Sequence, residues 1–299
     1  MKFFIDFVKG IFVGIANVIP GVSGGTMAVS FGIYDKLLSS ISNLLKEFKK
    51  SICTLLPIIL GMAVGVVGFT YIIPFLLEHY PFQTSCAFTG LIVGGIPAIL
   101  TSLKEGWNSE KKKSLLVNIV VFMLFIAIAI AMLFANGDGE SGIALTASVG
   151  MIIKIFFMGV IASATMIIPG VSGSLILMIL GYYFGILNAV KSFIDALKAF
   201  DIQGMLSQLY ILIPFALGCV LGIFFISKLI DWLLKHYTSA TFSAILALIV
   251  SSPVSIFYKV NQEYPMNFTL VSIIVGFVLF VACILVTKFF ETLSPQESE

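Results

Sequence analysis

The most constraining feature of the sequence is a helix-breaking segment that occurs twice inside long apolar runs. Ile19–Thr26 reads I-P-G-V-S-G-G-T, and Ile168–Leu175 reads I-P-G-V-S-G-S-L. Proline lacks a backbone N–H, and glycine adopts conformations that other residues avoid, so each segment interrupts a helix. Inside a lipid bilayer, such a break is tolerated only where it is buried in protein or lines a water-filled cavity. We therefore place the two segments, named motif 1 and motif 2, at the centre of the molecule.

The composition is that of a polytopic membrane protein. Of the 299 residues, 59% are hydrophobic and 11% are charged, whereas a soluble protein has about 25% charged residues. All 17 basic residues are lysine, which disfavours functions that need the bidentate grip of arginine on phosphate. The four cysteines lie singly, so a C-x-x-C metal or redox site is not expected. We expect no cofactor and no nucleic-acid partner.

The similarity between the two halves extends well beyond the motifs. An offset of 149 residues aligns the halves from Gly10 to Tyr34, and an offset of 157 residues aligns them from Pro57 onward. Matched positions are Gly10 with Gly159, Pro20 with Pro169, Gly32 with Gly181, Tyr34 with Tyr183, Pro57 with Pro214, Gly61 with Gly218, and Gly65 with Gly222. The sequence thus predicts two repeats, residues 1–142 and 143–299, with the motifs at 19–26 and 168–175.

Each repeat is expected to hold one broken, re-entrant helical hairpin and three transmembrane helices. The apolar segments lie near 52–77, 84–103 and 114–135, then near 209–230, 239–258 and 267–287. Whether the arms 3–19 and 145–168 span fully is left open, but the number of crossings per repeat is odd in either case. The second repeat must then be inverted, as in many secondary transporters. The predicted fold is an all-α polytopic membrane protein built from an inverted repeat.

The distribution of lysines sets the expected orientation. With the N-terminus inside, 13 lysines lie on the inner side and three on the outer side, with Lys154 at the start of an apolar arm. Positive residues concentrate in cytoplasmic loops. We therefore expect both termini to be cytoplasmic.

The motifs have the chemistry of an anion site. If a half-helix starts at or after Ser23, its first N–H groups lack partners and its dipole is positive at that end, which suits a phosphate or carboxylate. The alternative is that the motifs are only kinks that allow close helix packing. The candidate substrate-binding residues are Asn17, Pro20, Gly21, Ser23, Gly24, Gly25 and Thr26 around motif 1, and Thr165, Pro169, Gly170, Ser172, Gly173 and Ser174 around motif 2.

The paired motifs also carry a family resemblance. N-V-I-P-G-V-S-G-G-T, the second P-G-V-S-G-S, and the later Gly32-Ile33-Tyr34 and Gly181-Tyr182-Tyr183 resemble the bacterial polyprenyl-phosphate transporter family. The resemblance implies a flippase of the bacterial cytoplasmic membrane that moves undecaprenyl phosphate from the outer to the inner leaflet. That step recycles the lipid carrier of cell-envelope synthesis and needs no catalytic residues. Ser174 and Leu175 depart from the pattern of motif 1, so the two motifs need not act equally.

Two other functions stay open. A membrane-embedded polyprenyl diphosphate phosphatase is disfavoured because such an enzyme needs arginine or histidine at the phosphates, and His79 and His236 lie far from the motifs in sequence. A small-anion channel or carrier is the other alternative, because helix N-termini also bind chloride or free phosphate. The sequence leaves open the coupling ion, a proton or sodium, and the oligomeric state.

Two features outside the motifs have competing interpretations. Lys154 is expected to extend its charge to the membrane interface, with phosphate binding as the alternative. His79 and His236, each followed by tyrosine, are expected in aromatic belts, with a pH-sensitive gate as the alternative.

Overall fold

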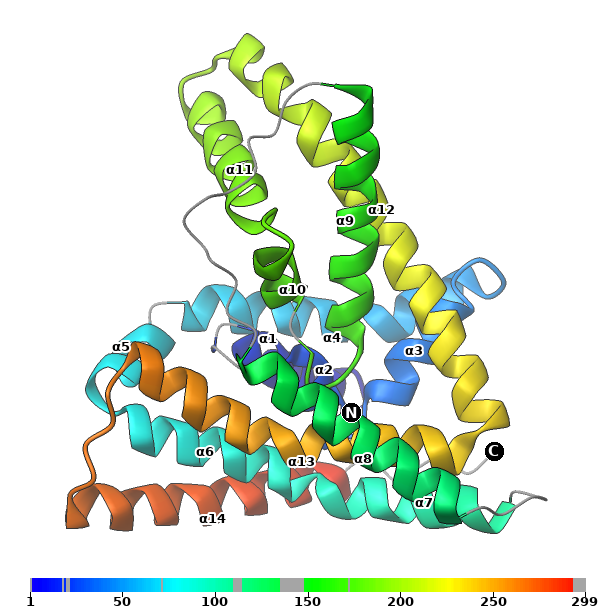
Figure 1. The fold of residues 1–299 in the computed structure, drawn as a ribbon, viewed down its shortest axis with the longest axis vertical. Coiled ribbons are helices and arrows are strands. Elements are labelled where there is room, and N and C mark those ends of the chain that lie inside the picture. The colour runs from blue at the N-terminus through cyan, green and yellow to red at the C-terminus, as the bar shows by residue number, and fades with distance from the viewer. Residues whose placement is uncertain are drawn as a thin grey trace. The chain divides into compact units, whose positions relative to one another are not determined.

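The computed structural model describes residues 2–17, 19, 22–70, 72–109, 115–134, 148–171 and 173–292. These described residues form fourteen helices, α1 to α14 (Figure 1). Seven helical stretches in this part of the chain are long and apolar enough to cross a membrane. The chain is therefore a multi-pass membrane protein, and the part that the structure describes is built from helices.

The chain divides into two compact units, which are described separately. The large unit comprises residues 1–133, 168–171 and 228–299, and the small unit comprises residues 134–167 and 172–227. The helices of the large unit are α1 (Lys2–Ala16), α2 (Gly24–Ser30), α3 (Tyr34–Ser42), α4 (Phe48–Phe69), α5 (Ile72–His79), α6 (Pro81–Gly94), α7 (Ile96–Ser109), α8 (Leu115–Phe134), α13 (Thr238–Glu263) and α14 (Leu270–Thr292). Those of the small unit are α9 (Val149–Ile167), α10 (Gly173–Ile179), α11 (Tyr183–Lys198) and most of α12 (Ile202–His236), whose last residues belong to the large unit.

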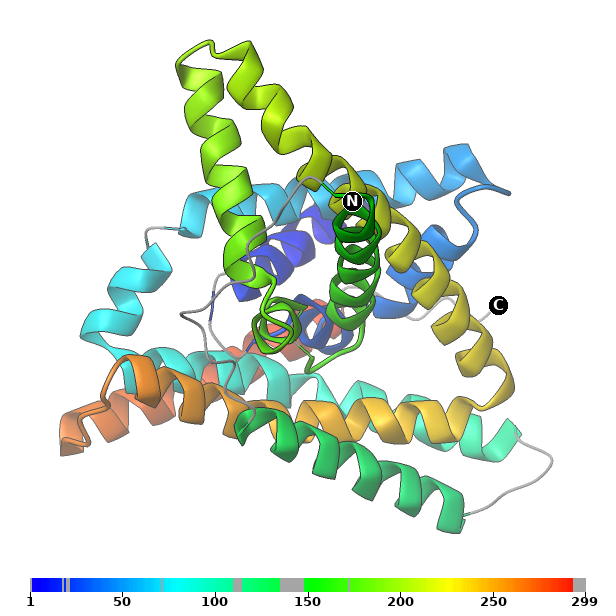
Figure 2. The same ribbon diagram turned by 45° about the horizontal axis from the view of Figure 1, so that its top comes forward.

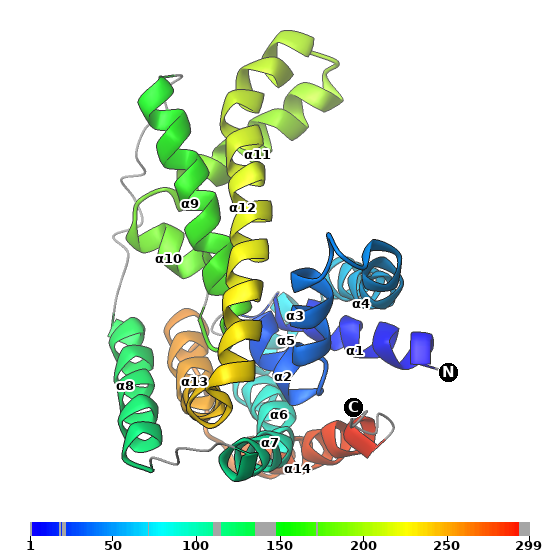
Figure 3. The same cartoon turned by 90° about the vertical axis from the view of Figure 1, so that its right-hand side faces the viewer.

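Helices α1 and α4 pack against each other through glycines (Figure 3). A Cβ at Gly10 would overlap the Ile58 carbonyl, and a Cβ at Gly61 or Gly65 would overlap a carbonyl of α1. Without a hydrophobic driving force between helices in lipid, close backbone approach at small residues supplies much of the packing energy. These glycines therefore fix the helix that leads into motif 1.

The second close pair in the large unit is α6 with α14, and α13 runs alongside α6 and α7 (Figures 1 and 2). A Cβ at Gly90 of α6 would overlap the Phe280 carbonyl of α14. Two turns further along α14, Thr287 Oγ1 donates to Leu91 O at 3.0 Å. Helices from the end of the chain are thus packed directly on helices from its first half.

Within the small unit, the α9–α12 contact repeats the α1–α4 contact residue by residue. A Cβ at Gly218 would overlap the Phe156 carbonyl, as one at Gly61 would overlap the Phe7 carbonyl. Gly218 lies 157 residues after Gly61, and Phe156 lies 149 residues after Phe7. These are the two offsets that align the repeats. The matching contacts support the duplication, whereas the inverted orientation of the second repeat stays a prediction.

Each expected spanning segment coincides with helix, but the first two are interrupted. Segment 52–77 contains α4 and α5, and segment 84–103 contains α6 and α7, which meet at Gly95. Pro97 has no N–H to continue the helical hydrogen-bond ladder, which accounts for the second break. The seventh candidate span is α9, the arm before motif 2, with 19 residues; its counterpart α1 has 15. The predicted repeat boundary at 142/143 lies outside the described residues.

Candidate anion-binding site at motif 1

Motif 1 turns the chain from the end of α1 into the short helix α2. Ser23 is the N-cap residue of α2, with extended backbone (φ −102°, ψ 134°), and its side chain makes no capping hydrogen bond. The first backbone bond of the turn runs from Met27 N–H to Ser23 O at 3.2 Å. The N–H groups of Gly24, Gly25 and Thr26 therefore precede the helical ladder. The half-helix starts where the sequence predicts.

Asn17 lies against the first residue of α2. A Cβ at Gly24 would lie 2.7 Å from Asn17 Oδ1 and 2.8 Å from Nδ2, so only glycine fits there without displacing the amide. Asn17 Nδ2 donates to Val13 O at 3.1 Å, which holds the side chain over the end of α1. An amide nitrogen has a second proton. Asn17 can therefore offer one further donor beside the start of α2.

Thr26 links the two motifs within the large unit. Its Oγ1 accepts a hydrogen bond from Gly170 N–H at 2.7 Å, and Thr26 is fully buried. Gly170 has φ +77°, a conformation that favours glycine, and a Cβ there would lie 3.0 Å from Leu248 Cβ and O. Residues 168–171 belong to the same compact unit as motif 1. Gly170 in the first half of motif 2 is thus hydrogen-bonded to Thr26, the last residue of motif 1.

The rest of α2 packs into the break between α6 and α7. Ser30 Oγ donates to Thr26 O at 3.0 Å and lies 3.4 Å from Ile92 O, close to the end of α6. A Cβ at Gly95 would overlap Ser30 Cα, so α2 sits directly on the interrupted backbone. The interruption of α6–α7 therefore makes room for the half-helix of motif 1.

Motif 2 continues into α10, in the small unit, with a different neighbour at the helix start. A Cβ at Gly173 would lie 2.5 Å from Ala162 O and 2.8 Å from Met166 Cγ. Met166 matches Asn17, and Gly173 matches Gly24, at the offset of 149. The matched side chain at the helix start is thus polar at motif 1 and apolar at motif 2. This difference makes motif 1 the better candidate for an anion site.

Several predicted residues carry no structural information on binding. Pro20, Gly21 and Ser172 lie outside the described residues, as does the side chain of Ser174. Thr165 Oγ1 bonds to Ile161 O at 3.0 Å and to Ala162 O at 2.9 Å, both on its own helix. Pro169 is buried in the large unit beside Gly170.

The residues with competing interpretations are described by their own exposure and by contacts within their own helices. Lys154 is exposed on α9, in keeping with a lysine that extends to the membrane interface. His79 Nδ1 lies 3.0 Å from Phe75 O and His236 Nδ1 lies 2.9 Å from Trp232 O, and each ring stacks on that aromatic neighbour. These matched positions make matched contacts, while membrane depth and gating stay predictions.

Two buried polar groups that contact α2, Ser30 and Lys9, are absent from the candidate residues derived from the sequence. A charged residue among the apolar residues of α1 was the available signal, because an ionisable group in a membrane segment is a candidate functional residue.

The chain is similar to known proteins over most of its length. The family described as undecaprenyl phosphate translocase-like matches residues 13–273. A polyprenyl-phosphate transporter of Staphylococcus aureus is 31% identical over 279 residues, which cover 92% of this chain and 94% of the relative. A polyprenyl-phosphate transporter of Vibrio cholerae is 32% identical over 269 residues, which cover 84% of this chain and 77% of the relative. No solved structure matches the chain.

Proposed function

The chain belongs to the undecaprenyl phosphate translocase-like family, and we propose that it moves undecaprenyl phosphate across the cytoplasmic membrane, from the outer to the inner leaflet. The observation that carries the proposal is the similarity to two polyprenyl-phosphate transporters over most of the chain. The biological role that follows is the return of the lipid carrier for another round of cell-envelope synthesis.

We assign the phosphate to the start of α2. Its donors are the N–H groups of Gly24, Gly25 and Thr26, the hydroxyl of Ser23, and the free amide proton of Asn17. Convergent N–H groups at a helix start favour an anion, and hydrogen bonds to a charged group are worth about 1.5–3 kcal/mol each. The nearby Thr26–Gly170 hydrogen bond of 2.7 Å supports a fixed geometry at this site.

The contribution of motif 2 is proposed to be unequal. The Gly170 N–H donates a hydrogen bond to Thr26 Oγ1. Met166 is an apolar neighbour at the start of α10, whereas the start of α2 has the polar side chain of Asn17. Thr165, Pro169, Ser172, Gly173 and Ser174 stay predicted contacts of the headgroup in one state of the transport cycle. In the inverted-repeat mechanism, alternating access would expose the same phosphate to each leaflet in turn.

The proposed transport step needs binding and release, without a covalent bond to the protein. The polyprenyl tail stays in the bilayer while the phosphate crosses through the protein. Only 11% of the most apolar 18-residue stretch is buried in α8, and the same share is buried in α14. The exposed apolar surface of these helices is suited to contact with lipid. A proton or sodium ion is the proposed coupling ion.

Reconstitution tests the proposal against both alternatives. Purified protein in liposomes is supplied with polyprenyl phosphate, polyprenyl diphosphate or inorganic phosphate, with and without an imposed proton gradient. We expect translocation of polyprenyl phosphate and no release of phosphate from the diphosphate. Uptake of inorganic phosphate alone would indicate a small-anion carrier, and phosphate release would indicate a phosphatase; either result would reject the proposal.

A further inference from the structure

Lys9 is a buried lysine at the opposite end of the motif 1 helix. Its side chain is fully buried (0% exposed), and its Nζ donates to Phe31 O at 2.7 Å. Phe31 is the C-cap residue of α2, so the ammonium group lies at the C-terminal end of this helix. That end carries a partial negative charge, which favours a cation. The burial of Lys9 is thus compensated by the helix that bears the proposed phosphate site.

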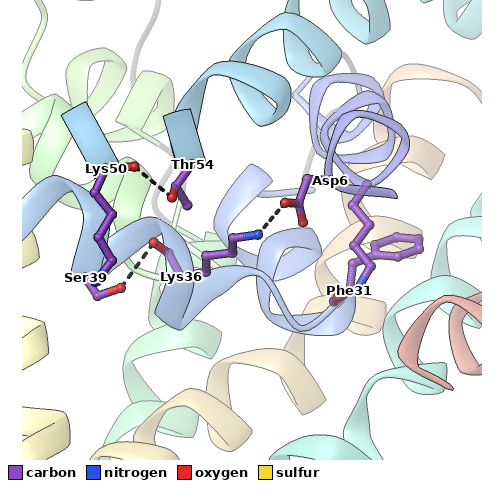
Figure 4. Close-up of polar contacts among 7 residues, drawn as sticks. Asp6, Phe31, Lys36, Ser39, Lys50 and Thr54 are labelled. Atoms are coloured by element: carbon purple, nitrogen blue, oxygen red, sulfur yellow. Dashed lines mark hydrogen bonds and ion pairs between the residues drawn. The ribbon is translucent and has the colours of Figure 1, made fainter. Parts of the chain in front are cut away.

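A second polar contact from α1 holds the next element. Lys36 of α3 forms an ion pair with Asp6, whose side chain is 10% exposed and lies one turn before Lys9 (Figure 4). The turn between α2 and α3 contains Gly32 at φ +66°, so the two helices meet at a sharp reversal. Helix α1 therefore attaches to both sides of this reversal, to α2 through Lys9 and to α3 through Asp6.

We propose that Lys9 is a positioning residue for transport: it anchors the C-terminal end of α2 and so sets the direction of the phosphate-binding end. A seven-residue helix is about 10 Å long, so Lys9 does not contact the phosphate. It acts through the orientation of α2, because contacts at both ends of a short helix fix the direction of the helix axis. The link to transport rests on the proposed function, whereas the anchoring of α2 does not.

The second repeat supports this assignment by contrast. The position that matches Lys9 is Met158, which packs at the edge of the apolar cluster formed by Ala162, Leu177, Tyr182 and Ile186. Helix α10 thus follows an arm that has no lysine at the matching place. Methionine is an unbranched apolar side chain close in length to lysine. Lys9→Met therefore places the residue of the second repeat at this position and removes only the charged donor.

The experiment compares hydrogen–deuterium exchange and transport in the full chain. Amide exchange of the peptide covering residues 24–31 is measured by mass spectrometry for the wild type, Lys9→Met and Lys9→Gln, which keeps an N–H donor without the charge. Lys154→Met is the matched control, because Lys154 is exposed on the corresponding arm. The Michaelis constant and maximal rate for polyprenyl phosphate are then measured in liposomes.

We expect Lys9→Met to increase exchange of residues 24–31 at least tenfold, with Lys9→Gln between it and the wild type. The peptides of α4 and α13 and the control variant should stay at wild-type rates. The Michaelis constant should rise at least fivefold while the maximal rate changes less than twofold, a separation that a general loss of folded protein does not produce. Unchanged exchange in Lys9→Met and Lys9→Gln would overturn the proposal.

The two readouts separate this inference from the proposed function. If the wild type does not translocate polyprenyl phosphate but Lys9→Met still loosens α2, the function fails and the anchoring stands. If exchange in α2 rises and the Michaelis constant is unchanged, Lys9 has no positioning role in transport. If Lys9→Met does not fold, the exchange and kinetics of Lys9→Gln decide between the same outcomes.

Discussion

At the scale of single residues, two side chains distinguish motif 1 from motif 2. The hydroxyl oxygen of Thr26 accepts a hydrogen bond from the Gly170 N–H. Asn17 lies against the start of α2, whereas Met166 lies against the start of α10. The matching residue of Thr26 is Leu175, which has no hydroxyl. The repeat therefore preserves the backbone break and changes the polar groups around it. We infer that the chemistry is concentrated in motif 1.

Replacement of Thr26 by valine tests the connection between the motifs. Thr26→Val keeps the shape of the side chain but leaves the partly buried Gly170 N–H without its acceptor, a loss that costs about 0.5–1.5 kcal/mol. We expect a lower unfolding temperature in detergent and slower transport. Thr26→Ser keeps the hydroxyl and should stay close to the wild type. Equal stability of Thr26→Val and Thr26→Ser would show that the hydrogen bond contributes nothing.

At the scale of helices, the glycine contacts explain how a broken segment is held in place. Helix α1 packs on α4 before motif 1, and α9 packs on α12 before motif 2, through glycines at matched positions. Each interrupted segment is thus preceded by a helix fixed against a long apolar neighbour. Rigid packing on one side of the break offsets the hydrogen bonds that the break removes.

The matched contacts predict matched effects of mutation. Gly61→Ala and Gly218→Ala each place a methyl group on a carbonyl of the facing helix, and overpacking of this kind costs about 1–3 kcal/mol. Both variants should unfold at lower temperature by similar amounts. Gly150→Ala is the control, because a Cβ at Gly150 meets nothing within 4 Å. A loss of stability in only one of the pair would contradict equivalent packing in the two repeats.

The local features of these helices could be predicted from sequence, but their long-range contacts could not. Proline and glycine in motif 1 favour a half-helix that starts at or after Ser23, and α2 starts at Gly24, inside the motif; α10 starts at the matching Gly173. The break at Gly95 was missed because apolar residues on both sides read as one continuous segment. The Thr26–Gly170 and Lys9–Phe31 contacts join residues distant in sequence, which periodicity does not reveal. Such contacts depend on how the helices pack in three dimensions.

At the scale of the whole molecule, the predicted duplication is connected to transport. The family match covers residues 13–273, and two polyprenyl-phosphate transporters align with most of the chain. Lysine distribution and the odd number of crossings predict that the repeats have opposite orientations in the membrane. An inverted pair would offer one phosphate site to the two leaflets in turn.

Labelling from one side of the membrane tests this inversion. In a variant without Cys53, Cys86, Cys219 and Cys283, a single cysteine is introduced by Lys46→Cys or by Lys198→Cys. A membrane-impermeant maleimide added outside intact cells should label the second variant and spare the first. Labelling after membrane disruption provides the control for reactivity. The same labelling pattern for both variants in intact cells would contradict opposite orientations.

Phosphate binding at motif 1 is tested by the rate of polyprenyl phosphate translocation in liposomes by Asn17→Met, which gives motif 1 the neighbour found at motif 2. Met166→Leu, an apolar exchange at the matching position, is the control. The loss of one donor to a charged phosphate, worth about 1.5–3 kcal/mol, predicts roughly 10- to 100-fold weaker binding. Translocation at low substrate concentration should fall accordingly in Asn17→Met and stay near the wild-type rate in Met166→Leu. Wild-type translocation by Asn17→Met, or an equal loss in both variants, would contradict phosphate binding at motif 1.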